Sequence, residues 1–265
     1  MKRQIEGIGV AAAVVLALVI ACDRVEPTAP AAHLTRTVAA PDAAPPKNLS
    51  IGLCSPGRAG FTIQSTNPYF PMDVGRQLIL MGEENGESII LQFTVLDRTR
   101  VISGVTTRVI EEREFVDGEL SEVTWNYHVE ASDGTNCYYG EDVDVYGDTG
   151  ITHDGAWCAA TTGNQPGIFM PADPRPGMMY QNEVAPGVAE DEAKIVGAGP
   201  QRVPYGQFSQ AIRVREHDPL TGDKDFKVYA SGVGVIVDAT LQLVAVHSTS
   251  GTPDEPTLTA QACGS

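Results

Sequence analysis

The chain has 265 residues, and its 34 Asp and Glu against 18 Lys and Arg give a formal net charge of −16 at pH 7. A field of this sign repels phosphate backbones and anionic lipid headgroups, which argues against nucleic-acid binding and against charge-driven binding to membranes. The length is sufficient to bury a substantial hydrophobic core.

The first predicted element is an export signal. Lys2 and Arg3 precede an apolar run that reaches Ile20, and this run is too short to predict a membrane-spanning helix. Residues 1–21 are therefore expected to be a signal peptide. The ending LVIAC resembles the lipobox of bacterial lipoproteins, which implies that Cys22 is lipidated and becomes the first residue of the mature protein. The alternative is an ordinary cleaved signal that leaves Cys22 as a thiol.

Residues 22–47 are expected to form the lipid anchor and a tether. They are rich in Ala, Pro and Thr and have no apolar period, a composition typical of an extended chain that does not collapse. The expected protein is exported and membrane-anchored, in the periplasm or on the cell surface, and it contacts the bacterial membrane through the lipid on Cys22.

Residues 48–265 are predicted to form one β domain. Short segments rich in β-branched and aromatic residues alternate apolar with polar positions, and turn pairs such as Asn85-Gly86 and Asp117-Gly118 separate them. The predicted fold class is all-β, either a single antiparallel β-sandwich or a strongly curved half-barrel sheet. Residues 161–180 carry four prolines and three glycines, so we expect a long ordered loop between two groups of strands.

Four cysteines lie in this domain, and exported cysteines of even number usually form disulfides. Three connectivities are possible for Cys54, Cys137, Cys158 and Cys263. The positions favour Cys137 with Cys158, across a local loop, and Cys54 with Cys263, between the two ends of the domain.

The first candidate site lies between Met178 and Val196, where acidic residues flank a Pro-Gly turn. Glu183, Glu190 and Asp191 are candidates for an acid and base pair at the rim of the sheet, assisted by Tyr180 or His128. The alternative is that a turn in an acidic protein simply carries solvated acids. The sequence contains no H-E-x-x-H motif and no G-x-S-x-G motif, so standard hydrolase chemistry is unsupported.

The second candidate site is a calcium site at Asp142, Asp144 and Asp148, although their spacing differs from the EF-hand pattern. Alternating acids on a solvent-facing strand explain the same residues. We predict no cofactor, with calcium possible.

Aromatic residues are few and gather near the acids. Exposed rings beside carboxylates would suit a carbohydrate or another neutral polar ligand, but aromatic residues of a β domain are more often core. We therefore expect most of the following six to be buried: Trp125, Tyr127, Tyr138, Tyr139, Trp157 and Tyr180.

Several stretches resemble a group of exported bacterial β-rich lipoproteins that have no assigned activity. They are NPYFPMDVGRQLIL (67–80), YYGEDVDVY (138–146), PGIFMPADPRPGMMYQNEVAPGVAEDEAKIV (166–196) and the region from VPYGQF to GVGVIV (203–237). The last region is also similar to the closing strands of cell-envelope β-proteins with strongly curved sheets. The resemblance implies a fold and supplies no function.

Two functions remain open. The first is a non-catalytic lipoprotein that binds a neutral small ligand or an envelope protein through a concave sheet face. The second is an enzyme that acts on a neutral polar substrate such as a glycan, as a hydrolase or lyase that uses paired carboxylates.

Overall fold

The computed structural model describes residues 48–263. The predicted signal peptide, the lipidated Cys22 and the tether lie outside these residues. Within them, no helix is long and apolar enough to cross a membrane.

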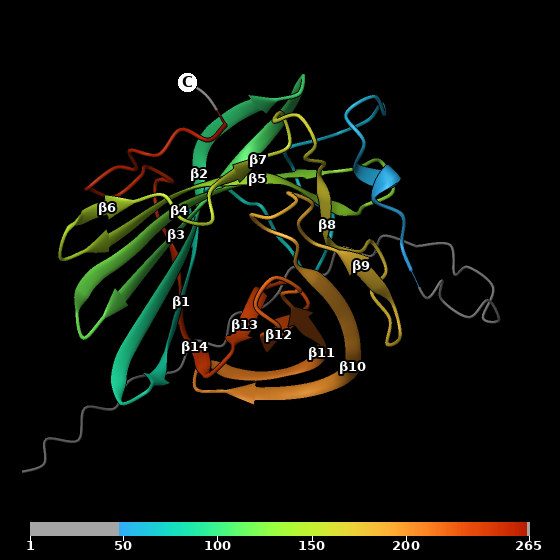
Figure 1. The fold of residues 1–265 in the computed structure, drawn as a ribbon. Helices are drawn as coiled ribbons and strands as arrows, with labels where there is room; N and C mark the ends of the chain where they lie inside the picture. The colour runs from blue at the N-terminus through green and yellow to red at the C-terminus, as the bar shows by residue number, and fades with distance from the viewer. Residues whose placement is uncertain (1–47, 264–265) are drawn as a thin grey trace, which may run out of the picture. The chain divides into compact units, whose positions relative to one another are not determined.

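Residues 48–263 form one large antiparallel sheet (Figure 1). A short 3-10 helix, Ile51–Cys54, precedes the strands. The strands are β1 (Arg76–Glu84), β2 (Glu87–Ile102), β3 (Val105–Val116), β4 (Glu119–Glu130), β5 (Asn136–Gly147), β6 (Gly150–Thr152), β7 (Trp157–Cys158), β8 (Gly167–Met170), β9 (Met179–Gln181), β10 (Glu192–Val203), β11 (Gly206–His217), β12 (Lys224–Ala230), β13 (Gly234–Asp238) and β14 (Leu241–Ser248). The predicted all-β class is confirmed.

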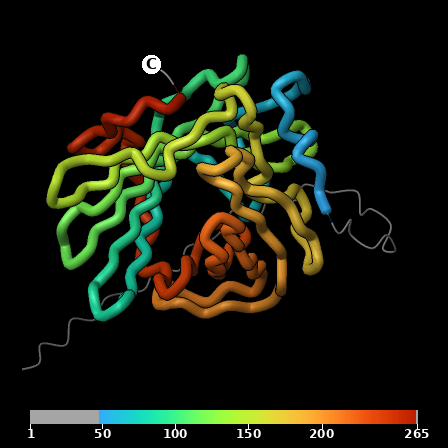
Figure 2. Tube along the Cα trace, in the orientation of Figure 1, coloured from blue at the N-terminus to red at the C-terminus, as the bar shows by residue number. Residues whose placement is uncertain are grey.

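The sheet is continuous, so it matches the strongly curved alternative and not two stacked sheets. Its strand order is β6-β5-β4-β3-β2-β1-β14-β13-β12-β11-β10-β9, and β7 and β8 also pair with β5. The sheet curls until β10–β13 lie opposite β2–β5 (Figure 2). It does not close into a ring; an isolated bridge from Gln165 to Val184 links the segments before β8 and after β9.

Tight two-residue turns set the register of the longest strands. Asn85, Ser103 and Asp117 each have φ near +50° and each is followed by a glycine of positive φ. Two consecutive positive φ values give the hairpin turn whose twist matches that of the strands. The turns predicted at Asn85-Gly86 and Asp117-Gly118 are thus confirmed.

The predicted crossing loop, residues 161–180, leads from the β5 side of the sheet to β10, and it contains β8 and the start of β9. At Gly167 the loop passes against another backbone segment. A Cβ there would lie 1.8 Å from the carbonyl oxygen of Asn182, so only glycine permits this approach.

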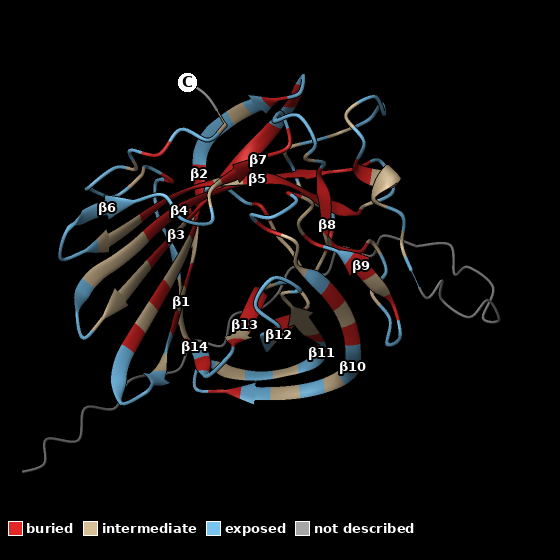
Figure 3. Cartoon of the chain, in the orientation of Figure 1, coloured by how far each residue is buried: buried red, intermediate tan, exposed pale blue. Residues whose placement is uncertain are grey.

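The core lies along β3, β4 and β5, where burial is most continuous from Thr107 to Glu111, from Val123 to Glu130 and from Asn136 to Gly140 (Figure 3). The prediction that most of the six aromatic residues are buried is confirmed, and all six are buried. One face of these strands is covered by residues 249–263, which we call the C-terminal strap.

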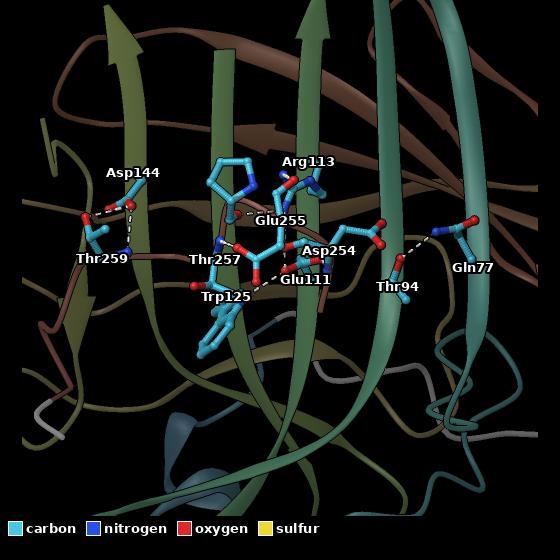
Figure 4. A network of polar contacts seen from close by, with 11 residues as sticks. Gln77, Thr94, Glu111, Arg113, Trp125, Asp144, Asp254, Glu255, Thr257 and Thr259 are labelled. Atoms are coloured by element: carbon cyan, nitrogen blue, oxygen red, sulfur yellow. Dashed lines mark hydrogen bonds and ion pairs between the residues drawn. The ribbon is translucent and has the colours of Figure 1, made fainter. Parts of the chain in front are cut away.

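Buried charges hold the C-terminal strap to the sheet (Figure 4). Arg113 donates hydrogen bonds to the backbone carbonyls of three successive strap residues, from Asp254 to Pro256, at 3.1 to 3.2 Å. Glu111 accepts from the Trp125 indole at 2.9 Å and from the backbone N–H of Asp254 at 3.3 Å. The acids and the arginine on this face are therefore satisfied by the chain itself.

The four cysteines do form two disulfides, but the predicted pairing is wrong. The bonds join Cys54 to Cys137 and Cys158 to Cys263. Cys158 pairs across the sheet with Gly140, three positions along β5 from Cys137, so it is offset from Cys137. The 3-10 helix reaches Cys137 instead, and the C-terminal strap brings Cys263 to β7. Two disulfides indicate an oxidising, extracytoplasmic setting.

Candidate functional site: an acidic cavity inside the curled sheet

The curled sheet encloses a cavity of about 220 Å³ on the face opposite the C-terminal strap. Side chains alternate between the two faces of a strand. Glu111 and Arg113 contact the strap, whereas Glu112 between them lines the cavity. The same strand therefore presents charge to two different environments.

Polar residues of β4 and β5 form one wall. Asn126 pairs with Glu141 and His128 pairs with Tyr138 across these strands, and all four line the cavity. The wall opposite contains residues of β11, β12 and β13 and of the connection from β9 to β10, namely Glu216, Lys227, Tyr229, Asp238, Asn182, Glu183 and Asp191.

The cavity holds seven carboxyl groups. Lys227 lies 3.2 Å from Glu216 and 3.5 Å from Asp238, so two of the seven are paired with a cation. Burial works against the charge of Lys227, but the two carboxylates hold its pKa well above the usual value. Among the residues described, the other five have no cation within ion-pair distance: Glu112, Glu122, Glu141, Glu183 and Asp191.

Desolvation keeps several of these five carboxyls protonated. Burial raises the pKa of Glu112 to about 8 and that of Glu183 to about 8, and the Asp191 carboxylate adds to the effect at Glu183. Burial and the neighbouring Glu183 raise the pKa of Glu141 well above its usual value. Glu112 and Glu183 thus face the cavity mainly as neutral carboxylic acids near pH 7, and the pKa of Glu141 is shifted in the same direction.

The hydrogen bonds of Tyr138 support a protonated Glu141. The phenolic oxygen lies 2.5 Å from Asn126 Oδ1 and 2.8 Å from Glu141 Oε2. A phenol has one proton and can donate to only one of these oxygens. If Glu141 is protonated, its O–H donates to Tyr138 and Tyr138 donates to Asn126, so that all three groups are satisfied.

His128 is neutral because it is buried. Burial lowers its pKa to about 3. Nδ1 lies 2.9 Å from Asn136 Oδ1, which is an acceptor, so Nδ1 carries the proton and Nε2 is left with a lone pair. The ring is stacked on Tyr138, with centroids 4.8 Å apart, and contacts Phe169 edge-on.

Asn182 brings a buried acceptor to the cavity. Its side chain is 5% exposed, and its Nδ2 donates weakly to Glu216 at 3.4 Å. Its Oδ1 is buried and accepts no hydrogen bond from the residues that the structure describes. An unpaired buried oxygen of this kind costs stability, so it marks a position where a ligand can donate.

The remaining part of the cavity is apolar. Phe70, Phe93 and Phe169 line it together with Val233 and Val235. A hydrophobic wall facing a few fixed polar groups is the usual composition of a small-molecule site.

A second hollow adjoins the cavity and is still more acidic. It shares Glu112, Asp191, Glu216, Lys227 and Asp238 with the cavity. Nine carboxyl groups and two lysines line it in total. The approach to the cavity therefore carries a strongly negative field.

The five sequence candidates for acid and base chemistry are not all brought together. Glu183, Asp191 and His128 line the cavity. Glu190 instead accepts a hydrogen bond from the backbone N–H of Gly187 at 2.6 Å in its own exposed turn. Tyr180 is buried, and its hydroxyl finds no partner among residues 48–263.

At the predicted calcium site, the carboxylates of Asp142 and Asp144 accept hydrogen bonds from the protein itself. Asp144 accepts from the backbone N–H of Thr259 and of Ala260, at 2.6 and 2.9 Å, and Asp142 accepts from the Tyr127 hydroxyl and from the backbone N–H of Cys263. Asp148 lies exposed in a turn. No group of three His, Cys, Asp or Glu side chains suited to a metal ion occurs in the described part of the chain.

Several cavity residues were not selected from the sequence. Glu112, Lys227, Asp238 and Asn182 come from strands and connections far apart in the chain. No sequence pattern marks Glu112, because β3 carries polar and charged residues on both of its faces.

No protein-family model, curated protein or solved structure matches this chain. The function must therefore be argued from the cavity itself.

Proposed function

We propose that the protein is an extracytoplasmic lipoprotein whose β domain binds a small molecule in the cavity between the two halves of the curled sheet. The lipid on Cys22 would hold it at the bacterial membrane, as the sequence of its first 22 residues supports. The observation that carries the proposal is Asn182, whose buried Oδ1 has no hydrogen-bond partner among residues 48–263 and belongs to the wall of a cavity that is apolar on one side.

Energetics favour a binding role over a purely structural one. Buried carboxyls without partners destabilise a fold, and replacement by apolar residues is often neutral or stabilising. The chain satisfies the acids beneath the C-terminal strap, whereas five of the seven cavity acids have no cation beside them among the described residues. A bound ligand that pairs with them would offset this cost.

The experiment uses the exported protein and two matched valine variants. Val235→Phe adds bulk inside the cavity, whereas Val101→Phe adds the same bulk at a position that is 64% exposed. A small-molecule library is screened by thermal shift and by ligand-observed NMR. We expect hits on the parent and on Val101→Phe that disappear in Val235→Phe. Hits that survive in Val235→Phe would place binding elsewhere and refute the proposal.

An enzyme is the second candidate, because Glu183, with a pKa of about 8, and His128, with a free lone pair, line the same cavity. A protonated carboxyl and an unprotonated imidazole are a general acid and a general base at neutral pH. The test is turnover of neutral glycans by the protein and by Glu183→Gln. Loss of turnover with binding retained would support catalysis, and equal turnover by the two proteins would exclude this role for Glu183.

A further inference from the structure

We propose that the cavity selects a small organic cation, a primary amine attached to an aromatic ring or a short apolar chain. This inference rests on the proposed binding function and names the ligand class of the same site.

Charge is the first argument. Five of the seven carboxyls in the cavity have no cation beside them in the described structure, and Lys227 is already paired with Glu216 and Asp238. Arg76 also lines the cavity, but its guanidinium lies 3.2 Å from Asp73, which is largely exposed. An entering anion would find no free cation in the cavity and would raise the pKa of its acids further, whereas a cation would allow these acids to ionise and would pair with them.

The hydrogen-bonding groups of the wall also favour a cation. Asn182 Oδ1 and the Nε2 of neutral His128 are acceptors in the free cavity. Glu183 and Glu112 are protonated there and become acceptors only when they release their protons. The Tyr138 hydroxyl is engaged with Asn126 and Glu141. An ammonium group has three N–H donors and no acceptor, so it complements Asn182, His128 and the acids that ionise beside it.

The apolar wall defines the rest of the ligand. Phe70, Phe93 and Phe169 lie on the same cavity as the acids, and aromatic faces attract cations as well as apolar groups. A cavity of about 220 Å³ is larger than the roughly 150 Å³ of an engineered apolar cavity that binds benzene. A ligand with a single ring and a short amine arm therefore fits.

A metal ion is a poorer occupant than an amine. Hard cations need several oxygen ligands converging at short distance. The described residues offer no such group of three, and one wall of the cavity is aromatic. The adjoining acidic hollow would instead raise the local concentration of any cation and speed its entry.

The test compares three probes of one shape: benzylamine, benzyl alcohol and benzoate. Calorimetric titration of the exported protein should show benzylamine binding about tenfold or more tightly than benzyl alcohol, and no binding of benzoate. Titrations in buffers of different ionisation enthalpy should show that protons are released when benzylamine binds. The reason is that an ammonium group favours the ionised form of carboxyls that were protonated in the free cavity.

Variants assign this effect to the cavity acids. Glu183→Gln and Glu112→Gln should each weaken benzylamine by about tenfold, reduce the proton release and leave benzyl alcohol unchanged. Glu119→Gln changes an exposed acid at the start of β4 and should alter none of these quantities.

The outcomes separate this inference from the binding function on which it rests. If benzyl alcohol binds as tightly as benzylamine and no protons are released, the cation inference is wrong and small-molecule binding stands. If calcium or magnesium chloride binds in the cavity more tightly than benzylamine and Glu183→Gln abolishes that binding, the site is a metal site and the amine is rejected. If none of the three probes binds, the cation inference fails, and the library screen with the valine variants decides the binding function separately.

Discussion

The stability of this protein should fall as the pH rises from about 5 to about 9, and Glu112 offers the clearest test. Burial raises its pKa from 4.5 to about 8, so the folded protein retains a proton that the unfolded chain releases near pH 4.5. The stabilisation linked to this proton is complete below about pH 4.5 and is lost progressively up to about pH 8. Glu112→Gln removes the titration while preserving the shape of the side chain.

The magnitude follows from the difference between the two pKa values. At about 1.4 kcal/mol per pKa unit, the change from 4.5 to about 8 corresponds to roughly 5 kcal/mol. The side chain is only half-buried, so solvent screening reduces this figure, and we expect about 2 kcal/mol. Glu112→Gln should therefore be more stable than the parent by about 2 kcal/mol near pH 9 and equal to it near pH 5.

Urea unfolding followed by tryptophan fluorescence at these two pH values measures both quantities. Glu119→Gln, at an exposed position of β4, is the matched control, and its difference from the parent should be the same at both pH values. The reasoning is refuted if Glu112→Gln destabilises the protein equally at both, because the carboxylate would then be making a favourable contact.

Three further predictions concern the C-terminal strap. Arg113→Met should lower the free energy of unfolding by about 3 to 5 kcal/mol, because it leaves Glu111 buried beside unpaired strap carbonyls; urea unfolding against exposed Arg58→Met measures it. Asp144→Asn should cost about 2 kcal/mol, since an amide N–H₂ faces a backbone donor, and added calcium should restore none of it in a thermal melt. Replacing both Cys158 and Cys263 by Ala removes a disulfide between residues 105 positions apart. Urea unfolding should then show a free energy of unfolding lower by about 4 to 5 kcal/mol. A decrease below about 1 kcal/mol would contradict the chain-entropy model.

The fold could be predicted because its signals are local. Apolar and polar residues alternate along each strand, and pairs such as Asn85-Gly86 require the positive φ values of a hairpin turn. Sandwich and curved sheet share these signals, so the sequence left both open. Which one forms depends on pairings between distant strands, such as β1 with β14, that no local pattern records.

The disulfide connectivity could not be predicted for a related reason. The prediction joined cysteines that are close in sequence, Cys137 and Cys158, and then the two ends of the domain. In the structure, each end returns separately to β5 or its neighbour β7: the 3-10 helix places Cys54 beside Cys137, and the C-terminal strap places Cys263 beside Cys158. The path of a terminal segment over a sheet is set by tertiary contacts, such as those of Arg113 with the strap carbonyls.

The candidate site was predicted in part. The acidic stretch after β9 drew attention to Glu183 and Asp191, and His128 was selected as a titratable group on a polar strand face; all three line the cavity. Glu190 and Asp191 are adjacent in sequence, and only the structure shows that one belongs to a turn and the other to the cavity. No sequence pattern distinguishes Lys227 and Asp238, because their role depends on the cavity residues that they face in the folded sheet.

The acids on the two faces of β3 differ in the partners that the chain gives them, and this difference supports a ligand in the cavity. Glu111 and Glu112 are consecutive residues of one strand; Glu111 is buried and Glu112 is half-buried. Glu111 receives a hydrogen bond from Trp125, another from the C-terminal strap, and a nearby cation in Arg113. Glu112 receives none of these from the described residues, although the chain demonstrably builds such partners only one residue away. Since an unpaired buried acid lowers stability and Glu112→Gln should recover that loss, retention of the acid is best explained by a cationic partner that is not part of the chain.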